Sequence, residues 1–407
     1  MKCRLGPAIG LVALLFLVVP VSHGRSEDNA VDTLQGAIAA LEAGDVTGAE
    51  RTLRPLAAGD PEATAWLAVA LLKRGDRQGL AEAVQLLHEA AGVGNARARY
   101  LLAFQYAAGE GVPRDETRAA LLFQEAAEGG IARAAYNLGV LYTKGRGVQP
   151  DTTQAMAWYR RAADAGDAYG AYALARAIER SPQASTRAAE IAQLYRVAAD
   201  QGHLPAAQRY ASLLIEGRGV QRDVAAAERY LRHAMSNGYP EAGMLMGDLS
   251  ASIAMSSRGA QAQAAARNAV TWYRAAAEAG VAMAQFKLAN ALFAGTGVER
   301  DLARAEQWYG RAARQGLADA QYVLGIWRVG GVASPPDAVE GYMWLLLAER
   351  AGNTNAAKVR MRAMEKVSAG DQQQAEARAA GFRPQPERPR SRPDDEAPPL
   401  RPMPPRQ

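Results

Sequence analysis

The chain has 407 residues, of which 49% are hydrophobic but only 7% aromatic, and its formal net charge is +5. Small apolar residues, chiefly alanine, therefore supply most of the apolar surface, and this favours closely packed helices. The basic residues are spread along the chain instead of forming a concentrated patch, which argues against a nucleic-acid-binding protein. This length indicates two or three domains, unless the chain is a repeat array that grows without one central core.

The first 24 residues have the pattern of a secretory signal peptide. Lys2 and Arg4 precede an apolar run over residues 9–19, which is short for a membrane span. We expect cleavage after Gly24 and therefore a secreted protein, periplasmic if the source is a bacterium; the alternative is an uncleaved membrane anchor. The single cysteine, Cys3, would be lost with the leader, which excludes disulfides, thiol catalysis and cysteine metal sites from the mature chain.

Residues 60–352 repeat at a fixed period. An Ala-Ala-x-x-Gly motif, or a close variant, ends each copy, and every step between endings is 36 residues except one of 42. Such self-similarity indicates small helical units that cannot bury their apolar faces alone and must therefore stack. The closing glycines are Gly94, Gly130, Gly166, Gly202, Gly238, Gly280, Gly316 and Gly352.

Each part of a copy has a mechanical interpretation, which the third copy illustrates. We expect a first helix over residues 132–143 that ends at Gly145, because a left-handed residue after a helix is cheapest as glycine. Asp151 should cap a second helix over residues 152–165. Columns of alanine and glycine should let neighbouring helices approach closely, and the column that contains Trp158 should fill the wider space nearby.

The repeat is similar to the Sel1-like repeat, a relative of the tetratricopeptide repeat. Residues 132–166 match its pattern of Leu-Gly-x-x-Tyr-x-x-Gly-x-Gly-Val followed by Asp, Trp and Ala-Ala-x-x-Gly, and residues 281–316 match almost as well. The resemblance covers about 60–352 in some eight copies, and residues 25–59 resemble a looser tetratricopeptide-like pair that caps the array. It implies an all-α fold, an α/α superhelical solenoid.

The same resemblance implies a function. It points to a non-catalytic scaffold or adaptor that binds another protein, an extended peptide or an envelope polysaccharide, in a bacterial signalling or polysaccharide system. A regulator that restrains a membrane sensor is a further possibility. A cell-wall hydrolase or β-lactam-binding enzyme is the alternative, because one branch of the family resembles such proteins. That branch joins its repeats by disulfides, which the mature form of this chain would lack.

Two copies depart from the pattern. In the fourth, residues 178–187 replace the Gly-x-Gly-Val loop, and in the sixth, residues 248–266 replace it and add six residues. Irregular segments on a regular scaffold often carry contacts. We favour tolerated loop drift, because surface loops absorb insertions at low cost.

The C-terminal end of the chain leaves the repeat pattern. Residues 353–380 read as one long polar helix or two short ones that cap the array. In residues 381–407 proline recurs among charged residues, which predicts a disordered tail. The run Pro402–Pro405 could be a ligand for a proline-reading groove, but a solvated tail is the interpretation we favour.

No residues gather in a catalytic or metal-binding pattern. The histidines occupy unrelated repeat positions without ligand spacing, so we predict no metal and no cofactor. The Gly-x-Gly-Val loop recurs four times and lacks the rest of a phosphate-binding motif, which indicates a structural turn. No serine elbow is present, and we therefore predict that the protein is not an enzyme.

One aromatic column is the candidate binding site. Its members occupy equivalent first-helix positions, and first helices line the inner surface of related solenoids, so the rings could grip a peptide or a sugar chain. The alternative, which we favour, is that they pack between repeats, because periodic aromatic residues at helical spacing are mostly core. The members are Tyr100, Tyr136, Tyr172, Phe286 and Tyr322.

Overall fold

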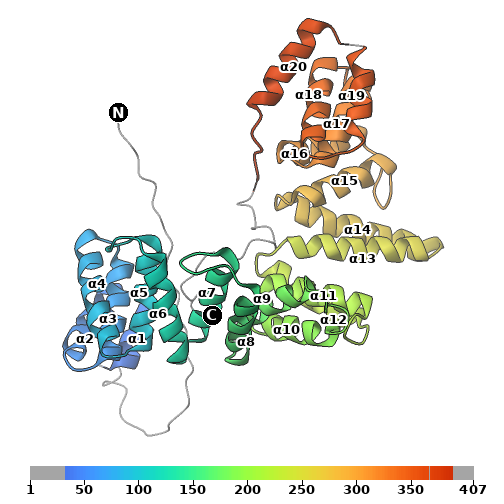
Figure 1. Cartoon of the computed structure of the whole chain (residues 1–407). Coiled ribbons are helices and arrows are strands. Elements are labelled where there is room, and N and C mark those ends of the chain that lie inside the picture. The colour runs from blue at the N-terminus through green and yellow to red at the C-terminus, as the bar shows by residue number, and fades with distance from the viewer. Residues whose placement is uncertain (1–32, 366, 388–407) are drawn as a thin grey trace. The chain divides into compact units, whose positions relative to one another are not determined.

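The structure, a computed structural model, describes residues 33–365 and 367–387. These residues form 20 α-helices, and no strand occurs among them. The chain divides into two compact units, which contain the described residues 33–203 and 204–387 respectively. Within each unit consecutive helices lie side by side (Figure 1). The expected signal peptide and residues 388–407 lie outside the described part.

The first unit contains ten helices among its described residues. They are α1 (Leu34–Glu42), α2 (Val46–Ala57), α3 (Pro61–Arg74), α4 (Arg77–Gly92), α5 (Ala96–Ala108), α6 (Glu116–Glu128), α7 (Ala132–Lys144), α8 (Thr152–Asp164), α9 (Ala168–Glu179) and α10 (Ala188–Asp200). The pair α1 and α2 precedes the repeats, where the sequence predicts a cap.

The second unit also contains ten described helices. They are α11 (Leu204–Glu216), α12 (Val224–Ser236), α13 (Glu241–Ser256), α14 (Gly259–Glu278), α15 (Ala282–Ala294), α16 (Leu302–Arg314), α17 (Ala318–Gly330), α18 (Ala338–Arg350), α19 (Ala356–Met364) and α20 (Ala369–Gly381). Helices α3 to α18 form eight pairs, which is the number of copies that the period predicts.

The third copy has the local structure that its sequence predicts. Helix α7 ends at Gly145, whose φ of 62° is left-handed and whose N–H donates to the Leu141 carbonyl. The Asp151 side chain accepts from the N–H groups of Thr153 and Gln154 at 2.8 and 3.0 Å, and so caps α8. These caps satisfy backbone groups that the helix ends leave free.

The Gly-x-Gly-Val loop packs directly on the preceding copy. Gly147 has a φ of 69°, and a side-chain carbon added there would lie 2.0 Å from the Glu116 carbonyl oxygen at the start of α6. Only glycine permits both the left-handed conformation and this approach. The loop is therefore a stacking device, in agreement with the structural turn that its repetition predicts.

The small-residue columns lie in the core, as predicted. The eight alanines of the Ala-Ala-x-x-Gly motif are at most 2% exposed: Ala90, Ala126, Ala162, Ala198, Ala234, Ala276, Ala312 and Ala348. At Gly139 an added side-chain carbon would lie 2.6 Å from the ring of Tyr159. The absence of a side chain on α7 thus makes room for an aromatic ring from α8.

Three of the four tryptophans in the tryptophan column do not fill the core in the way we expected, whereas the fourth, Trp344, is 5% exposed and lies in a hydrophobic cluster. In the third copy the buried ring is Tyr159, while Trp158 is only half-buried and carries the Arg161 guanidinium 5.3 Å from its ring centre. Neighbouring positions on a helix point about 100° apart, so the following tyrosine faces α7 and the tryptophan does not. Trp272 and Trp308 are likewise half-buried under arginines.

The sixth copy is not a drifting loop. Its extra residues extend α13 to 16 residues and α14 to 20 residues, whereas most repeat helices have 13. The segment is rich in alanine, serine and glutamine and lacks the closing glycine that ends most other first helices, so the helical conformation continues. The fourth copy does break its pattern, with turns between α9 and α10.

The C-terminal segment forms two short helices, α19 and α20, and then packs against the second unit. The sequence predicts disorder from residue 381, but Phe382–Glu387 contact α15, α16 and α18. The prediction is wrong for these residues because it considers composition alone, whereas two of the contacts depend on particular complementary side chains, Trp344 for Phe382 and Arg311 for Glu387. The described chain ends at Glu387.

Candidate binding surfaces

The predicted aromatic column lies mainly in the core of the helix pairs. Tyr100 and Tyr136 are each 1% exposed. The ring of each member from Tyr100 to Phe286 packs on an aromatic ring 23 residues later, on the second helix of its own copy. The pairs, with their centroid distances, are Tyr100–Phe123 at 5.9 Å, Tyr136–Tyr159 at 6.0 Å, Tyr172–Tyr195 at 5.8 Å and Phe286–Tyr309 at 5.6 Å.

The remaining members of the column are half-buried. Tyr172 lies beside His203, with ring centroids 4.4 Å apart, Phe286 packs beside the cluster that contains Trp344, and Tyr322 packs beside Tyr342. The geometry of Tyr100 and Tyr136 supports packing over binding, because rings so deeply buried cannot meet a ligand. A binding role for Tyr172, Phe286 and Tyr322 stays a prediction.

A buried charged cluster lies in the first unit. Arg133 of α7 donates to Asp167 at 2.6 Å and lies 4.1 Å from the ring centre of Tyr169. Burial opposes the charge of Arg133, but the attraction and hydrogen bond of Asp167, together with Tyr100 and Tyr169, outweigh it and raise the pKa of the guanidinium. The hydroxyl of Tyr136 and both side-chain polar atoms of Asn137 have no partner among the described residues.

Two of the histidines, His88 and His203, take part in packing. The rings of Tyr169 and His203 meet edge to face at 4.8 Å. His88, which its column predicts to be a surface residue, is half-buried, and its Nε2 lies 3.0 Å from the Tyr106 hydroxyl of the next copy. Within residues 33–365 and 367–387, no three His, Cys, Asp or Glu side chains are grouped so that they could hold a metal ion.

The lengthened helices of the sixth copy border an apolar cavity of about 770 Å³. Tyr273 and Val270 of α14 line it together with the Gly295–Val298 loop. Met255 stands at its edge and is 83% exposed. The cavity therefore lies beside the helices that the six extra residues lengthen.

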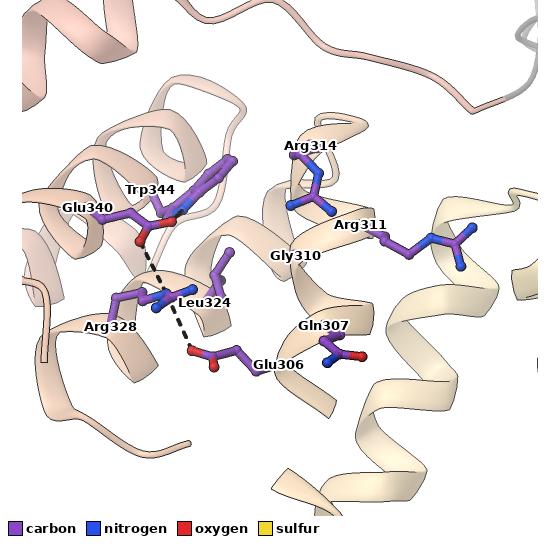
Figure 2. Close-up of a pocket in the computed structure, with 9 residues that line it drawn as sticks. All are labelled: Glu306, Gln307, Gly310, Arg311, Arg314, Leu324, Arg328, Glu340 and Trp344. Atoms are coloured by element: carbon purple, nitrogen blue, oxygen red, sulfur yellow. Dashed lines mark hydrogen bonds and ion pairs between the residues drawn. The ribbon is translucent and has the colours of Figure 1, made fainter. Parts of the chain in front are cut away.

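A second cavity, of about 310 Å³, lies between α16, α17 and α18 (Figure 2). Arg328 lies between two carboxylates, with N···O distances of 3.3 Å to both Glu306 and Glu340. Glu340 also accepts from the Trp344 indole N–H at 3.1 Å. Glu306, Arg328 and Glu340 are therefore already partnered with one another.

The rim of this cavity on α16 is basic. Arg311 and Arg314 project from α16 away from the Glu306–Arg328–Glu340 group (Figure 2). Arg311 lies 4.3 Å from the ring centre of Trp308, and together these two residues also border a neighbouring cavity of about 390 Å³. A flat aromatic ring with an arginine above it is a common site of contact with carboxylates and peptides.

Residues Phe382–Glu387, called here the docked segment, lie on this rim. The ring of Phe382 meets Trp344 edge to face at 5.6 Å. The Gln385 N–H donates to the Arg314 carbonyl at 2.8 Å. Arg311 Nε donates to Glu387 Oε1 at 2.9 Å. The docked segment is thus held by an aromatic contact at Phe382, a main-chain hydrogen bond at Gln385 and an ionic contact at Glu387.

Two glutamines complete the ionic contact. Gln285 of α15 is fully buried, and its Nε2 donates both to the Ala277 carbonyl at 3.1 Å and to Glu387 at 2.9 Å. Its Oε1 accepts from Gln315 at 2.9 Å. The hydrogen bonds from Arg311 lower the pKa of Glu387 by more than burial raises it. Nothing in the sequence pattern pointed to this site.

No described helix is both long and apolar enough to cross a bilayer. The search of curated proteins gave no match. A family model described as Sel1 repeat matches residues 96–131, 132–167, 204–239, 255–281, 282–317 and 318–353, just over half of the chain.

Two solved structures are similar to the chain. A Sel1 repeat protein from Oxalobacter formigenes is 28% identical with a TM-score of 0.60, and the match covers 84% of this chain and 97% of that one. A protective antigen present in uropathogenic Escherichia coli strains, with an SLR fold, is 26% identical with a TM-score of 0.47, covering 82% and 79%.

The structure adds two copies to the six that the family model matches. The pairs α3–α4 and α9–α10 occupy residues 61–92 and 168–200, outside every match. Neither has the Gly-x-Gly-Val loop between its helices. Both nevertheless keep the buried alanine of the closing motif, Ala90 and Ala198, so the helix contact persists where the loop signature is lost.

Proposed function

Because the chain belongs to the Sel1 repeat family, whose members are in general non-catalytic protein-interaction scaffolds, we propose that it is an exported adaptor that holds another protein in the bacterial cell envelope. The proposal has two parts, the binding of an extended peptide and the location. By binding another protein in this way, the chain would regulate an envelope signalling or polysaccharide system.

One observation carries the binding part: an extended stretch of polypeptide lies on the repeat array and is held through both its backbone and its side chains. The backbone N–H of Gln385 donates a hydrogen bond to the Arg314 carbonyl, and the Glu387 carboxylate accepts one from the Arg311 guanidinium. Contacts of this kind are those by which helical repeats can bind a partner segment, since stacked helices supply a rigid surface with little ordering cost.

A site-specific crosslinking experiment tests the binding part. A photoreactive phenylalanine replaces Trp308, beside the docked segment, and in a matched control it replaces Leu121, which is 55% exposed on α6. We expect the probe at residue 308 to capture one envelope protein in a saturable manner and the probe at residue 121 to give background only. Equal background at both positions, or turnover of peptidoglycan fragments or β-lactams by the purified chain, would contradict the proposal.

The location part is supported by the basic start and apolar run of the first 24 residues. A reporter phosphatase that is active only outside the cytoplasm, fused after residue 32, tests it. We expect activity that is lost when residues 2–24 are deleted. Activity that does not depend on the leader, or a fusion retained in the cytoplasm, would argue against export.

A further inference from the structure

We propose that the surface formed by α15, α16 and α18 is a recognition site for extended peptides with an aromatic residue five positions before a carboxylate, and that the docked segment occupies it as an internal competitor. This inference rests on the proposed scaffold function, and it specifies the site, the chemistry of the partner and a form of self-regulation. The partner is an extended segment of another protein that carries an aromatic residue and a carboxylate at this spacing.

The spacing of the contacts defines the ligand. Phe382 contacts Trp344 of α18, Gln385 contacts the last turn of α16, and Glu387 contacts both α15 and α16. Five residue steps of extended chain span about 17 Å. The docked segment forms neither a helix nor a strand, and it joins the aromatic and the ionic subsite within this length.

The ionic subsite is built for a carboxylate. Gln285 is 0% exposed, and its amide is oriented by the Ala277 carbonyl and by Gln315 before it donates to Glu387. A buried donor fixed by two other groups needs little reorganisation to meet an acceptor. Arg311 supplies two further donors to the same carboxylate, in the forked geometry that guanidinium groups favour with carboxylates.

The next copy shows that this arrangement is not a general property of the repeat. Gln321 is equivalent to Gln285 and donates to the Ala313 carbonyl at the same distance, 3.1 Å. The residue equivalent to Gln315 is Ala351, and the Oε1 of Gln321 has no partner within the described residues. The carboxylate subsite is therefore specific to the copy that contains α15 and α16.

The other arginine–tryptophan pairs support the same conclusion. Arg161 lies over Trp158 in the first unit, but its guanidinium donates to the Ala127 carbonyl instead of a carboxylate. Among the three half-buried tryptophans with an arginine above them, only Trp308 lies beside a docked chain segment among the described residues. Surface composition alone therefore does not explain the docking.

The position of the docked segment has a consequence for affinity. It follows α20 directly, so its effective concentration at the surface is that of a short tether, on the order of millimolar. A partner peptide must displace the docked segment. The apparent affinity of the peptide is therefore its intrinsic affinity multiplied by the fraction of molecules in which the surface is free. Release of the segment should therefore strengthen binding of a partner without any new contact.

A fluorescence anisotropy assay on the full chain tests the proposal. The probe is a labelled synthetic peptide with the sequence of residues 380–390. A release variant, F382S/E387R, should bind the probe at least about tenfold more tightly than the unmodified chain, because its own segment no longer competes. The matched control carries R304E, a charge change at an exposed arginine of the same helix, and should bind as the unmodified chain does.

Exchanging the charges of residue 311 and of the probe's glutamate distinguishes a lost ionic contact from an unfolded variant. R311E added to the release variant should abolish binding, and a probe with arginine in place of the glutamate should restore it. Failure of the release variant to bind the probe, or binding that does not depend on residue 311, would overturn the proposal.

The oligomeric state distinguishes docking within one chain from docking between two copies. If displacement depends on protein concentration and the chain is a dimer in solution, the segment belongs to a second copy and the internal form is rejected. The assay is independent of the cellular crosslinking, so the scaffold function and this site can fail separately.

Discussion

At the scale of single residues, Glu387 makes the docked segment sensitive to pH. The charged groups that face it are Arg311 and Arg314 of α16, and Glu278 of α14 acts on it indirectly through Arg311. Arg311 lowers the pKa of Glu387 below its ordinary value of 4.5. A carboxylate with a lowered pKa stabilises the docked state fully above its ordinary pKa, and this contribution disappears as the pH falls through the lowered value.

We therefore expect the segment to remain docked at neutral pH and to detach as the pH falls below 4.5, the ordinary pKa of glutamate. A fluorinated phenylalanine at residue 382 reports docking through its fluorine resonance. The control, Glu387→Gln, should show no transition in this range. An identical titration in both proteins would mean that Glu387 does not control docking.

The packing of Gly139 gives a second prediction at this scale. In Gly139→Ala the new carbon would lie 2.6 Å from two ring atoms of Tyr159 and 3.1 Å from the Ala155 carbonyl. We expect a loss of about 1–3 kcal/mol in the free energy of unfolding, because the ring and the helix must move apart. Urea denaturation measures it.

A matched glycine serves as the control. An added carbon at Gly310 on α16 meets only the Arg314 side chain, at 3.4 Å. Gly310→Ala should therefore stabilise the helix by about 0.5–1 kcal/mol. Equal effects of the two substitutions would show that the close approach on α7 is unimportant.

At the scale of elements, the regular copies were predictable and the departures were not. The roles of Gly145 and Asp151 can be predicted from their residue types, because a left-handed turn and a helix N-cap each favour few residues. The sixth copy lacks such signals, and a missing loop motif does not by itself distinguish a longer helix from an irregular loop. Its Ala-rich composition was the available evidence for longer helices.

A proline substitution distinguishes the two interpretations of the sixth copy. Ala264 is exposed near the start of α14, within the extra residues. Ala264→Pro should cost roughly 3 kcal/mol, because proline removes a helical hydrogen bond and clashes with the preceding turn. Ala264→Gly should cost about 1 kcal/mol. Denaturant unfolding gives both values, and a neutral effect of proline would restore the loop interpretation.

The candidate site could be predicted from the sequence even less well than the irregular copies. Tyr100 and Tyr136 belong to a periodic column, and periodicity reports packing between copies, which is where their rings lie. The contact of Gln285 with Glu387 joins residues 102 positions apart and occurs in one copy only. No period or composition can reveal such a pair, because it depends on where an irregular segment meets one particular amide.

At the scale of the whole molecule, contacts between neighbouring helices dominate in both units. Within each unit most repeat helices contact mainly the helices before and after them, and some first helices also contact the first helix of the next copy. Stability in such an array is a sum of local terms, so damage spreads to neighbours and fades with distance. The docked segment is an exception, because it joins the end of the described chain to α15, α16 and α18.

Hydrogen exchange should separate these two kinds of contact. Gly139→Ala should reduce protection in α7 and the adjoining helices α6, α8 and α9, and leave α15 to α18 unchanged, because damage in a repeat array fades over the copies that separate two helices along the chain. The F382S/E387R variant should do the reverse, loosening α15, α16 and α18 while the first unit keeps its protection. Uniform loss of protection in either variant would mean that the chain unfolds as one cooperative body. The nearest-neighbour description, and with it a local role for the docked segment, would then fail.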